Sequence, residues 1–137
     1  QAALGLSQLE RLDEIVAERN SQLQHYRELL AHLRVQLLEV PEDVFSSVHL
    51  AVIRLADPSP ERHKCVFEGL RAAGIGVQLH YIPVHLQPYY RRLGFGEGSF
   101  PDAEAYATNA ISLPLYPGLQ DGDQQQVVRT IESLLVA

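Results

Sequence analysis

The chain has one cysteine, no methionine and no long hydrophobic run among its 137 residues. Cys65 alone cannot close an intramolecular disulfide, which excludes a disulfide-stapled secreted domain and favours a reducing compartment. No apolar stretch approaches the ~20 residues that a membrane-spanning helix needs, and no basic-then-apolar leader opens the sequence. We therefore expect a cytoplasmic protein that makes no membrane contact.

Basic residues are also scarce. The 11 lysines and arginines stand against 17 acidic residues, for a net charge of −6, and the only adjacent basic pair is Arg91-Arg92. An acidic chain without a basic stripe repels polyanions, so nucleic acid is not an expected partner. The remaining composition, 46% hydrophobic and 20% charged, is that of a globular protein long enough to bury an ordinary core.

An apolar stripe at helical spacing runs through the first third of the sequence. Apolar residues recur every three or four positions from Leu9 to Leu37, with Arg19 as the exception. Ser7 and Glu10 have the spacing of a capping box, in which each side chain accepts a free backbone N–H of the other residue. We predict one long connecting helix over residues 1–38 that packs across a domain. The same stripe permits a coiled coil as an alternative.

Residues 43–137 form the predicted α/β body, which reads as strand, helix, strand, a loop-rich excursion and a final helix. The predicted elements are strands over 44–55 and 76–82, a helix begun by Ser59-Pro60 and ended by Gly74, short helices over 85–92 and 101–110, and a last helix from Asp121. Residues 111–117 contain two prolines and are expected to form a short edge strand at most. We predict a single α/β domain with a small mixed or antiparallel sheet.

A cluster of polar aromatic residues follows the second predicted strand. His80, Tyr81 and His85 flank a sharp turn at Pro83. Two imidazoles and a phenol at a strand end can contact phosphate, sugar hydroxyls or a metal. Zinc needs about four ligands, and no third protein ligand is evident nearby, so metal is the weakest of these interpretations. A substrate-contacting edge and purely structural histidines both remain open.

Three other candidates have structural explanations. Lys64, the only lysine, has Glu61 and Glu68 at helical spacing and is assigned to a solvated helix face rather than to a nucleophile. Cys65 lies one residue before the buried stripe of the same helix and has no paired base, so we expect a half-buried structural thiol. The glycine-rich segment 94–98 neither follows a strand nor opens a phosphate-binding helix, so it is expected to be a loop. We expect no catalytic residue in this chain.

Three segments carry a family resemblance. Residues 1–9 read Gln-Ala-Ala-Leu-Gly-Leu-Ser-Gln-Leu, residues 74–85 read Gly-Ile-Gly-Val-Gln-Leu-His-Tyr-Ile-Pro-Val-His, and residues 110–119 read Ala-Ile-Ser-Leu-Pro-Leu-Tyr-Pro-Gly-Leu. In this order they resemble the sugar-nucleotide aminotransferases of the DegT/DnrJ/EryC1/StrS family, over essentially the whole chain. The His-Tyr-Ile-Pro-Val-His wording is most similar to the branch that aminates UDP-4-keto-6-deoxy-N-acetyl sugars for pseudaminic acid, and to a spore-coat polysaccharide relative.

The resemblance implies that residues 1–137 are the C-terminal small domain of a fold-type I pyridoxal-phosphate (PLP) enzyme. The first residues read as the end of a helix already under way, so we expect a piece of a longer protein. The parent would be a homodimer that transfers an amino group, usually from L-glutamate, to a nucleotide-linked 4-keto-6-deoxy sugar in polysaccharide or glycan biosynthesis. The family's Schiff-base lysine and phosphate-binding residues lie in the large domain, which is absent here. We therefore expect neither a bound cofactor nor activity from this chain alone.

By the same resemblance, the small domain closes over the active site at the dimer interface, where His80, Tyr81 and His85 would touch the sugar nucleotide. An imidazole and a phenol can donate hydrogen bonds to diphosphate or sugar oxygens. This interpretation predicts an exposed apolar patch on the long helix, where the large domain and second subunit would pack. The alternatives are a stand-alone α/β interaction or ligand-binding module, whose helix would be polar wherever it is exposed, and a coiled-coil adaptor.

Overall fold

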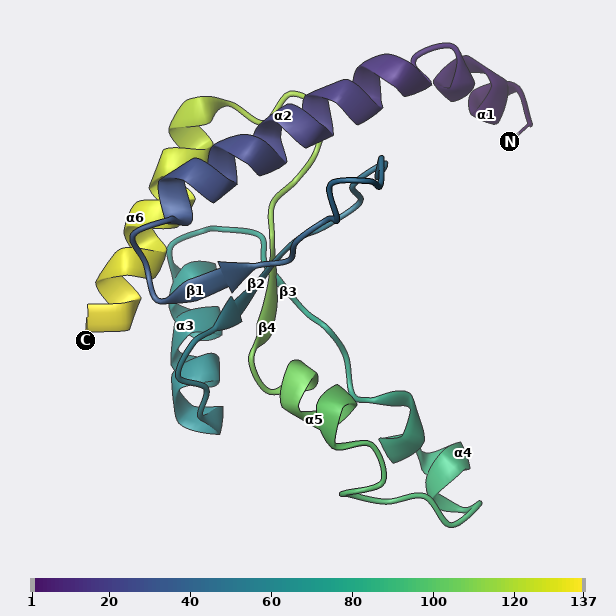
Figure 1. The fold of residues 1–137 in the computed structure, drawn as a ribbon, viewed down its shortest axis with the longest axis vertical. Coiled ribbons are helices and arrows are strands. Elements are labelled where there is room, and N and C mark those ends of the chain that lie inside the picture. The colour runs from purple at the N-terminus through teal and green to yellow at the C-terminus, as the bar shows by residue number, and fades with distance from the viewer. Residues whose placement is uncertain (1, 137) are drawn as a thin grey trace.

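The structure is a computed structural model that describes residues 2–136. Its elements are, in chain order, α1 (Ala2–Leu9), α2 (Leu12–Leu30), β1 (Val35–Leu37), β2 (Ala51–Leu55), α3 (Pro60–Ala72), β3 (Gln78–Leu79), a 3₁₀ turn η1 (Val84–Leu86), α4 (Pro88–Arg91), α5 (Pro101–Ala107), β4 (Ala110–Leu113) and α6 (Asp121–Val136). The longer helices lie beside the sheet, whereas η1, α4 and α5 form a separate lobe beyond its end (Figure 1).

Within the described residues the strands form one four-stranded sheet in the order β1-β2-β4-β3. Every neighbouring pair is antiparallel, which confirms the predicted α/β class and selects the antiparallel alternative. The prediction of an edge strand over 111–117 is wrong, because β4 pairs on both sides and is buried throughout. Its prolines do not interrupt the ladder, since Pro114 comes directly after the last strand residue.

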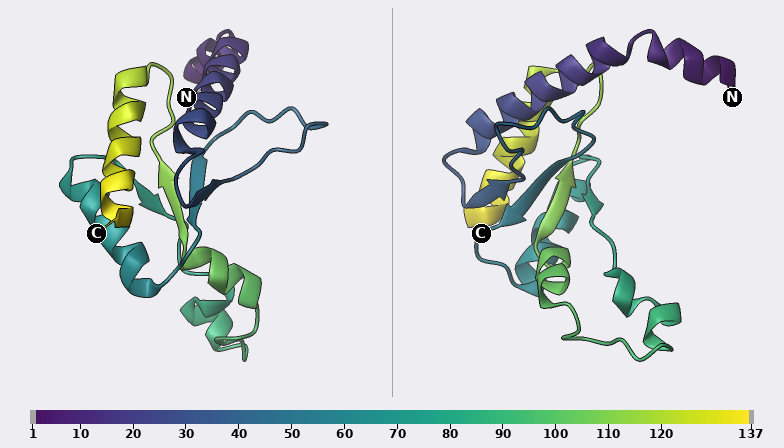
Figure 2. Two further views of the ribbon diagram at one scale, coloured as in Figure 1. Left: turned by 60° about the vertical axis from the view of Figure 1, so that its left-hand side comes forward. Right: turned by 45° about the vertical axis from the view of Figure 1, so that its right-hand side comes forward.

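The two faces of the sheet differ in their cover. Side chains alternate across a strand, so Ile53 and the directly opposite Ile111 point to one face and Val52 and Ser112 to the other. The first face packs against α2, α3 and α6 and forms the core. Tyr26 of α2, Leu70 of α3 and Ile131 of α6 are buried in it. No described helix covers the second face, as the turned views in Figure 2 show.

The long N-terminal helix is shorter than predicted. A break at Glu10-Arg11 separates α1 from α2, and α2 ends at Leu30 rather than near residue 38. Ser7 lies inside α1, so no capping box forms. Residues 35–37 instead pair with β2, because alternating apolar side chains there fit a strand as well as a helix and the sheet supplies backbone partners.

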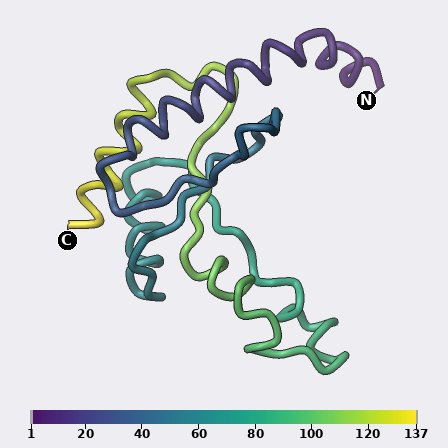
Figure 3. The backbone as a smooth tube through the Cα atoms, in the orientation of Figure 1, coloured from purple at the N-terminus to yellow at the C-terminus, as the bar shows by residue number. Residues whose placement is uncertain are grey.

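The burial of the same apolar stripe argues against the coiled-coil alternative. Leu23, Tyr26 and Leu30 are buried in the core that α2 shares with the sheet and α6, so this part of the stripe is not free to pair with a second helix. Leu9 and Leu12, by contrast, are exposed. The tube in Figure 3 shows the reason: α1 and the first turns of α2 extend beyond the body of the protein.

Two predicted strands are longer than the observed ones. The strand predicted over 44–55 begins only at Ala51, and the one predicted over 76–82 is limited to Gln78–Leu79. Each is interrupted by a non-glycine residue with positive φ: Val48 at 40° precedes β2 and Tyr81 at 52° follows β3. Residues 38–50 therefore form a projecting loop between β1 and β2, visible in dark blue (Figure 1).

Helix α3 matches its prediction closely. The Ser59 Oγ accepts a hydrogen bond from the Arg62 N–H at 3.1 Å, Pro60 occupies the first helical turn, and Gly74 adopts φ 79° just beyond the end. Lys64 faces solvent, with its Nζ 3.9 Å from a Glu68 carboxylate oxygen, as expected. The expectation for Cys65 is wrong, since its side chain is exposed. Around the helix axis it lies about 100° from the buried Val66 and about 140° from the buried Leu70, which takes it off the buried face.

Candidate functional site

His80 lies just after β3, on the sheet face that has no helical cover. Its Nε2 is 2.7 Å from the Oγ of Ser112, which belongs to the central strand β4. The imidazole also meets the edge of the Tyr106 ring, with 5.5 Å between ring centroids. The ring is half-buried, so these two contacts fix its orientation while leaving part of it accessible.

His85, in η1, has a different environment. Its side chain is buried, its Nε2 lies 2.8 Å from Oε1 of Glu104, and its ring packs on Phe100 at 4.9 Å between centroids. The Glu104 carboxylate also accepts the backbone N–H of Gly98 at 2.9 Å and that of Phe100 at 3.4 Å. The Gly98 hydrogen bond and then the His85 contact hold the pKa of Glu104 below its usual value.

These contacts give His85 a structural part. The 92–100 loop has few buried side chains of its own, and the Glu104 carboxylate ties it to both η1 and α5. We call this group of His85, Gly98, Phe100 and Glu104 the lobe clamp. No sequence pattern predicts this group, because Glu104 is one of several acidic residues and only the fold shows that it lies beside an imidazole.

Tyr81 is the most accessible of the three predicted residues. Its side chain is 79% exposed, and it makes no hydrogen bond or ring contact with the residues that the structure describes. It stands at the rim of an open, largely apolar depression of about 740 Å³ between α3 and the lobe, with walls that include Phe67, Leu79 and Leu86. The structure thus brings the three predicted residues into one region, but His80 and His85 have different partners and the Tyr81 ring has none among the described residues.

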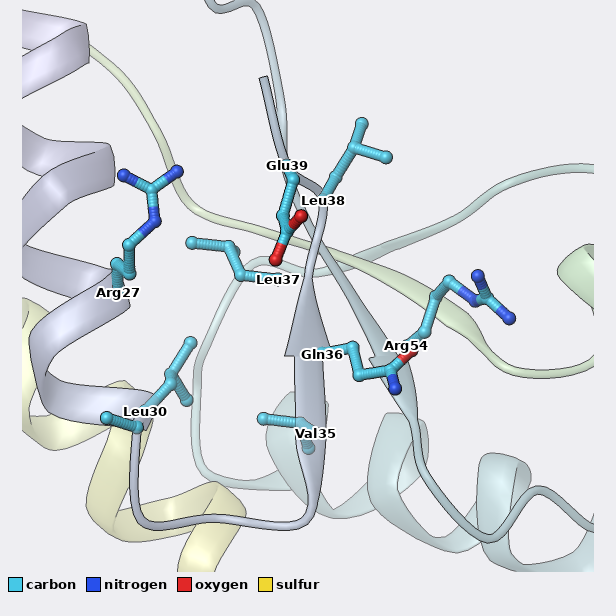
Figure 4. Close-up of a pocket in the computed structure, with 9 residues that line it drawn as sticks. Arg27, Leu30, Val35, Gln36, Leu37, Leu38, Glu39 and Arg54 are labelled. Carbon is cyan, nitrogen blue, oxygen red and sulfur yellow. The ribbon is translucent and has the colours of Figure 1, made fainter. Parts of the chain in front are cut away.

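A second hollow, of about 660 Å³, lies at the free edge of β1 and contains none of the predicted residues. Figure 4 shows Gln36 and Arg54 on one side of β1, and Arg27 with Leu30 on the other. Its two guanidinium groups therefore do not converge on one ligand atom. For this reason we place the candidate site at the end of β3 rather than here.

In the described part of the chain, no group of residues fits a metal ion or the PLP cofactor. Residues 2–136 contain no group of three histidine, cysteine or carboxylate side chains that could hold a metal ion. Lys64 does not fit a Schiff base with PLP, because it is exposed and paired with Glu68 on the outer side of α3. The 94–98 loop does not fit a phosphate cradle, since the Gly98 N–H already donates to Glu104.

No helix among residues 2–136 has the length and hydropathy needed to cross a membrane.

The outer surface of α1 and the start of α2 is apolar. No residue of α1 is buried, and Leu4, Leu6, Leu9 and Leu12 are all exposed, Leu4 at 66%. The chain exposes 9082 Å² in total, whereas a self-contained monomer of this mass exposes ~7,100 Å². The excess of ~1,900 Å² on this one chain is more than twice the ~800 Å² that each partner buries in a standard specific interface. The expected apolar patch is therefore present.

Comparison with known proteins identifies the class. A profile of the DegT/DnrJ/EryC1/StrS aminotransferase family matches residues 1–132. The chain belongs to this family, as its three sequence segments predicted. The spore coat polysaccharide biosynthesis protein SpsC of Bacillus subtilis is 32% identical over 139 residues, which cover 98% of this chain and 36% of SpsC.

Solved structures agree with this assignment. The PMP-form structure of Spr1654 from Streptococcus pneumoniae superposes with a TM-score of 0.92 at 33% identity, covering 97% of this chain and 34% of that one. Helicobacter pylori PseC, an aminotransferase involved in the biosynthesis of pseudoaminic acid, gives a TM-score of 0.82 at 25% identity over 96% of this chain and 36% of PseC. The chain spans about a third of the length of these relatives.

Proposed function

We propose that residues 1–137 are the C-terminal small domain of a PLP-dependent sugar aminotransferase, and that a large N-terminal domain carries the cofactor. The observation that supports this most is the apolar surface of α1 together with the ~1,900 Å² of excess exposed area. A partner surface of that size is what a domain separated from its larger neighbour would present. Relatives of about three times the length provide room for such a neighbour.

The proposed reaction moves an amino group from L-glutamate to the 4-keto carbon of a nucleotide-linked 6-deoxy sugar, and releases 2-oxoglutarate. Bound PLP supplies the electron sink and carries the amino group between the two substrates. Since Lys64 does not fit the cofactor, this chain alone should be colourless and inactive. We place the parent enzyme in the cytoplasm as a homodimer that serves polysaccharide or glycan biosynthesis.

Within that enzyme we assign the end of β3 to the nucleotide-sugar substrate. His80 presents an oriented imidazole, Tyr81 an exposed phenol, and both can donate to sugar or diphosphate oxygens. His80, Tyr81 and His85 all belong to this proposed site, and each has a different role. His85 acts from within the lobe clamp and supports the edge at which the other two meet the ligand.

The test is the reaction itself, with the product of the complete gene. Purified protein is incubated with PLP, L-glutamate and a UDP-linked 4-keto-6-deoxy-N-acetyl sugar, and the amino sugar and 2-oxoglutarate are measured. We expect both products in equal amounts, and none with residues 1–137 alone. Absence of amino sugar with UDP- and TDP-linked 4-keto sugars alike would contradict the proposal. The stand-alone binding module would then be preferred, although the exposed leucines of α1 disfavour it.

A further inference from the structure

Arg54 of β2 is a cation that has no carboxylate partner in the fold. By contrast, the guanidinium of Arg34 lies 2.7 Å from Asp57, and the Nζ of Lys64 lies 3.9 Å from Glu68. The Arg54 side chain is exposed and forms neither an ion pair nor a hydrogen bond within residues 2–136. Because the chain is acidic overall, with a net charge of −6, a guanidinium that no carboxylate neutralises is available to bind an anion.

The register of the sheet places Arg54 near the candidate site. Arg54 pairs with Ala110 of β4, and β3 pairs with the other edge of β4 as far as Leu79, so His80 follows beside Ala110. The 2.7 Å contact between His80 Nε2 and Ser112 Oγ shows that the imidazole lies over β4 on the same uncovered face. Neighbouring strands are ~4.8 Å apart, so the backbones of Arg54 and His80 are roughly 10 Å apart, with a small residue between them.

The Arg54 side chain points away from the helical layer. Figure 4 shows it directed away from Arg27 of α2. Figure 1 and the right-hand view of Figure 2 show that α1 and the lobe of η1, α4 and α5 extend beyond the sheet on the same side. A neighbouring domain that packs against the exposed leucines of α1 can therefore also close over Arg54. Such closure excludes water and strengthens the attraction between the guanidinium and an anion.

The amino donor of the proposed reaction is an anion of the required kind. L-glutamate carries two carboxylates, and arginine binds a carboxylate through two parallel N–H···O hydrogen bonds. Gln36 lies directly opposite Arg54 in β1 and adds an amide donor on the same face. The end of β3 is assigned to the nucleotide sugar, so the two substrates would have separate anchors on one face. Resting on the proposed function, we propose that Arg54 binds a carboxylate of the L-glutamate amino donor.

The half-reaction with L-glutamate tests this site because it needs no sugar. The product of the complete gene is loaded with PLP and mixed with L-glutamate, and the change in its visible spectrum is followed against the L-glutamate concentration. Arg54→Gln removes the charge and keeps a polar side chain. Loss of a hydrogen bond to a charged group should raise the half-saturating L-glutamate concentration by roughly 10- to 150-fold. Arg54→Lys keeps the charge without the planar fork and should recover part of this loss.

Binding without reaction provides an independent readout. Glutarate is a dicarboxylate without an amino group, and its affinity for the complete gene product is measured by calorimetry beside that of UDP. Arg54→Gln should weaken glutarate by a similar factor and leave UDP unchanged. The matched control is Arg27→Gln, which removes an exposed guanidinium on the other side of β1 and should alter neither affinity. The midpoint temperature of Arg54→Gln should stay within about 2 °C of the wild type, because the side chain is exposed and has no partner in the fold.

Several results would overturn the proposal. If Arg54→Gln responds to L-glutamate and binds glutarate as the wild type does, Arg54 is not the anchor, and intact transamination would leave the proposed function standing. A loss confined to UDP would assign Arg54 to the diphosphate instead. Equal losses for glutarate and UDP, or a large fall in midpoint temperature, would indicate a general effect on the protein. A gene product that neither takes up PLP nor transaminates would remove the proposed function and this site together.

Discussion

Removing a single buried oxygen should stabilise this protein. Tyr26 of α2 is completely buried, and its hydroxyl lies beside the Gln124 amide but makes no hydrogen bond of standard geometry with the described residues. The neighbouring Gln124 amide is engaged elsewhere, since its Nε2 donates to the Gln22 carbonyl at 2.9 Å and its Oε1 meets His25 Nδ1 at 3.1 Å. A buried hydroxyl without a partner costs about 1–3 kcal/mol. Tyr26→Phe removes that cost and leaves no cavity.

We expect Tyr26→Phe to stabilise residues 1–137 by about 1 kcal/mol, or roughly 3–4 °C in Tm for a chain of this length. The assay is thermal and urea unfolding at neutral pH, with Tyr89→Phe, on an exposed tyrosine, as the control that should change nothing. A fall in Tm of the Tyr26 variant would refute the reasoning, because it would mean that the hydroxyl is hydrogen-bonded in solution.

The same residue predicts a pH dependence. Burial raises the pKa of the Tyr26 phenol, so the folded chain keeps the phenol neutral where the unfolded chain ionises it. Because the pKa is higher in the folded chain, the phenol does not lower the free energy of unfolding below about pH 10. Above that pH the free energy of unfolding falls, by ~1.4 kcal/mol at about pH 11. Tyr26→Phe escapes this loss, so its advantage over the wild type should grow between about pH 9 and 11. An advantage that stays constant contradicts the assignment.

Other parts of the structure give three further predictions. Glu104→Gln should loosen the lobe clamp and speed hydrogen exchange at the amides of Gly98 and Phe100. Because the fold lowers the pKa of Glu104, the wild-type protection of these amides should also be lost as the pH falls below about 4.5. Exchange rates that change in neither experiment would contradict the clamp. Cys65 should react rapidly with a thiol reagent without denaturant, and Cys65→Ser should leave Tm within about 1 °C, whereas slow labelling would mean that the thiol is covered. Leu6→Glu should reduce self-association of residues 1–137 in light scattering without lowering Tm, since α1 buries nothing; a lower Tm would show that α1 packs on the body.

Local signals were enough to predict some elements. Ser59, Pro60 and Gly74 set the bounds of α3 because capping, a fixed φ and a left-handed C-terminus act within a few residues. The central position of β4 could not be predicted in this way. Its pairing with β2 and β3 depends on residues more than thirty positions away, and the nearby prolines suggested an edge.

The end of α2 shows the same limit. Leu33 and Leu37 continue a helical apolar pattern, but alternation over residues 35–37 fits a strand equally well, and pairing with β2 decides between the two. Leu33, Val35 and Leu37 cannot by themselves distinguish a helix from a strand. Tertiary contacts therefore overrode the local pattern.

For the candidate site, the sequence motif predicted the region of the chain but not the contacts within it. Sequence resemblance drew attention to His80, Tyr81 and His85, and the structure places all three around one turn. The partners Ser112 and Glu104 come from other elements, 32 and 19 residues away, and no local pattern links them to the histidines. The positive φ of Tyr81 was equally invisible, because tyrosine is a residue that ordinarily avoids it.

We propose that this chain belongs to a larger enzyme whose other part holds PLP. The visible absorption spectrum of the purified product of the complete gene, recorded before and after borohydride and after L-glutamate, tests this proposal. We expect a visible band from lysine-bound PLP that borohydride abolishes and L-glutamate converts to the pyridoxamine form, and no band from residues 1–137 alone. A complete gene product that stays colourless with added PLP would contradict the proposed PLP-binding enzyme.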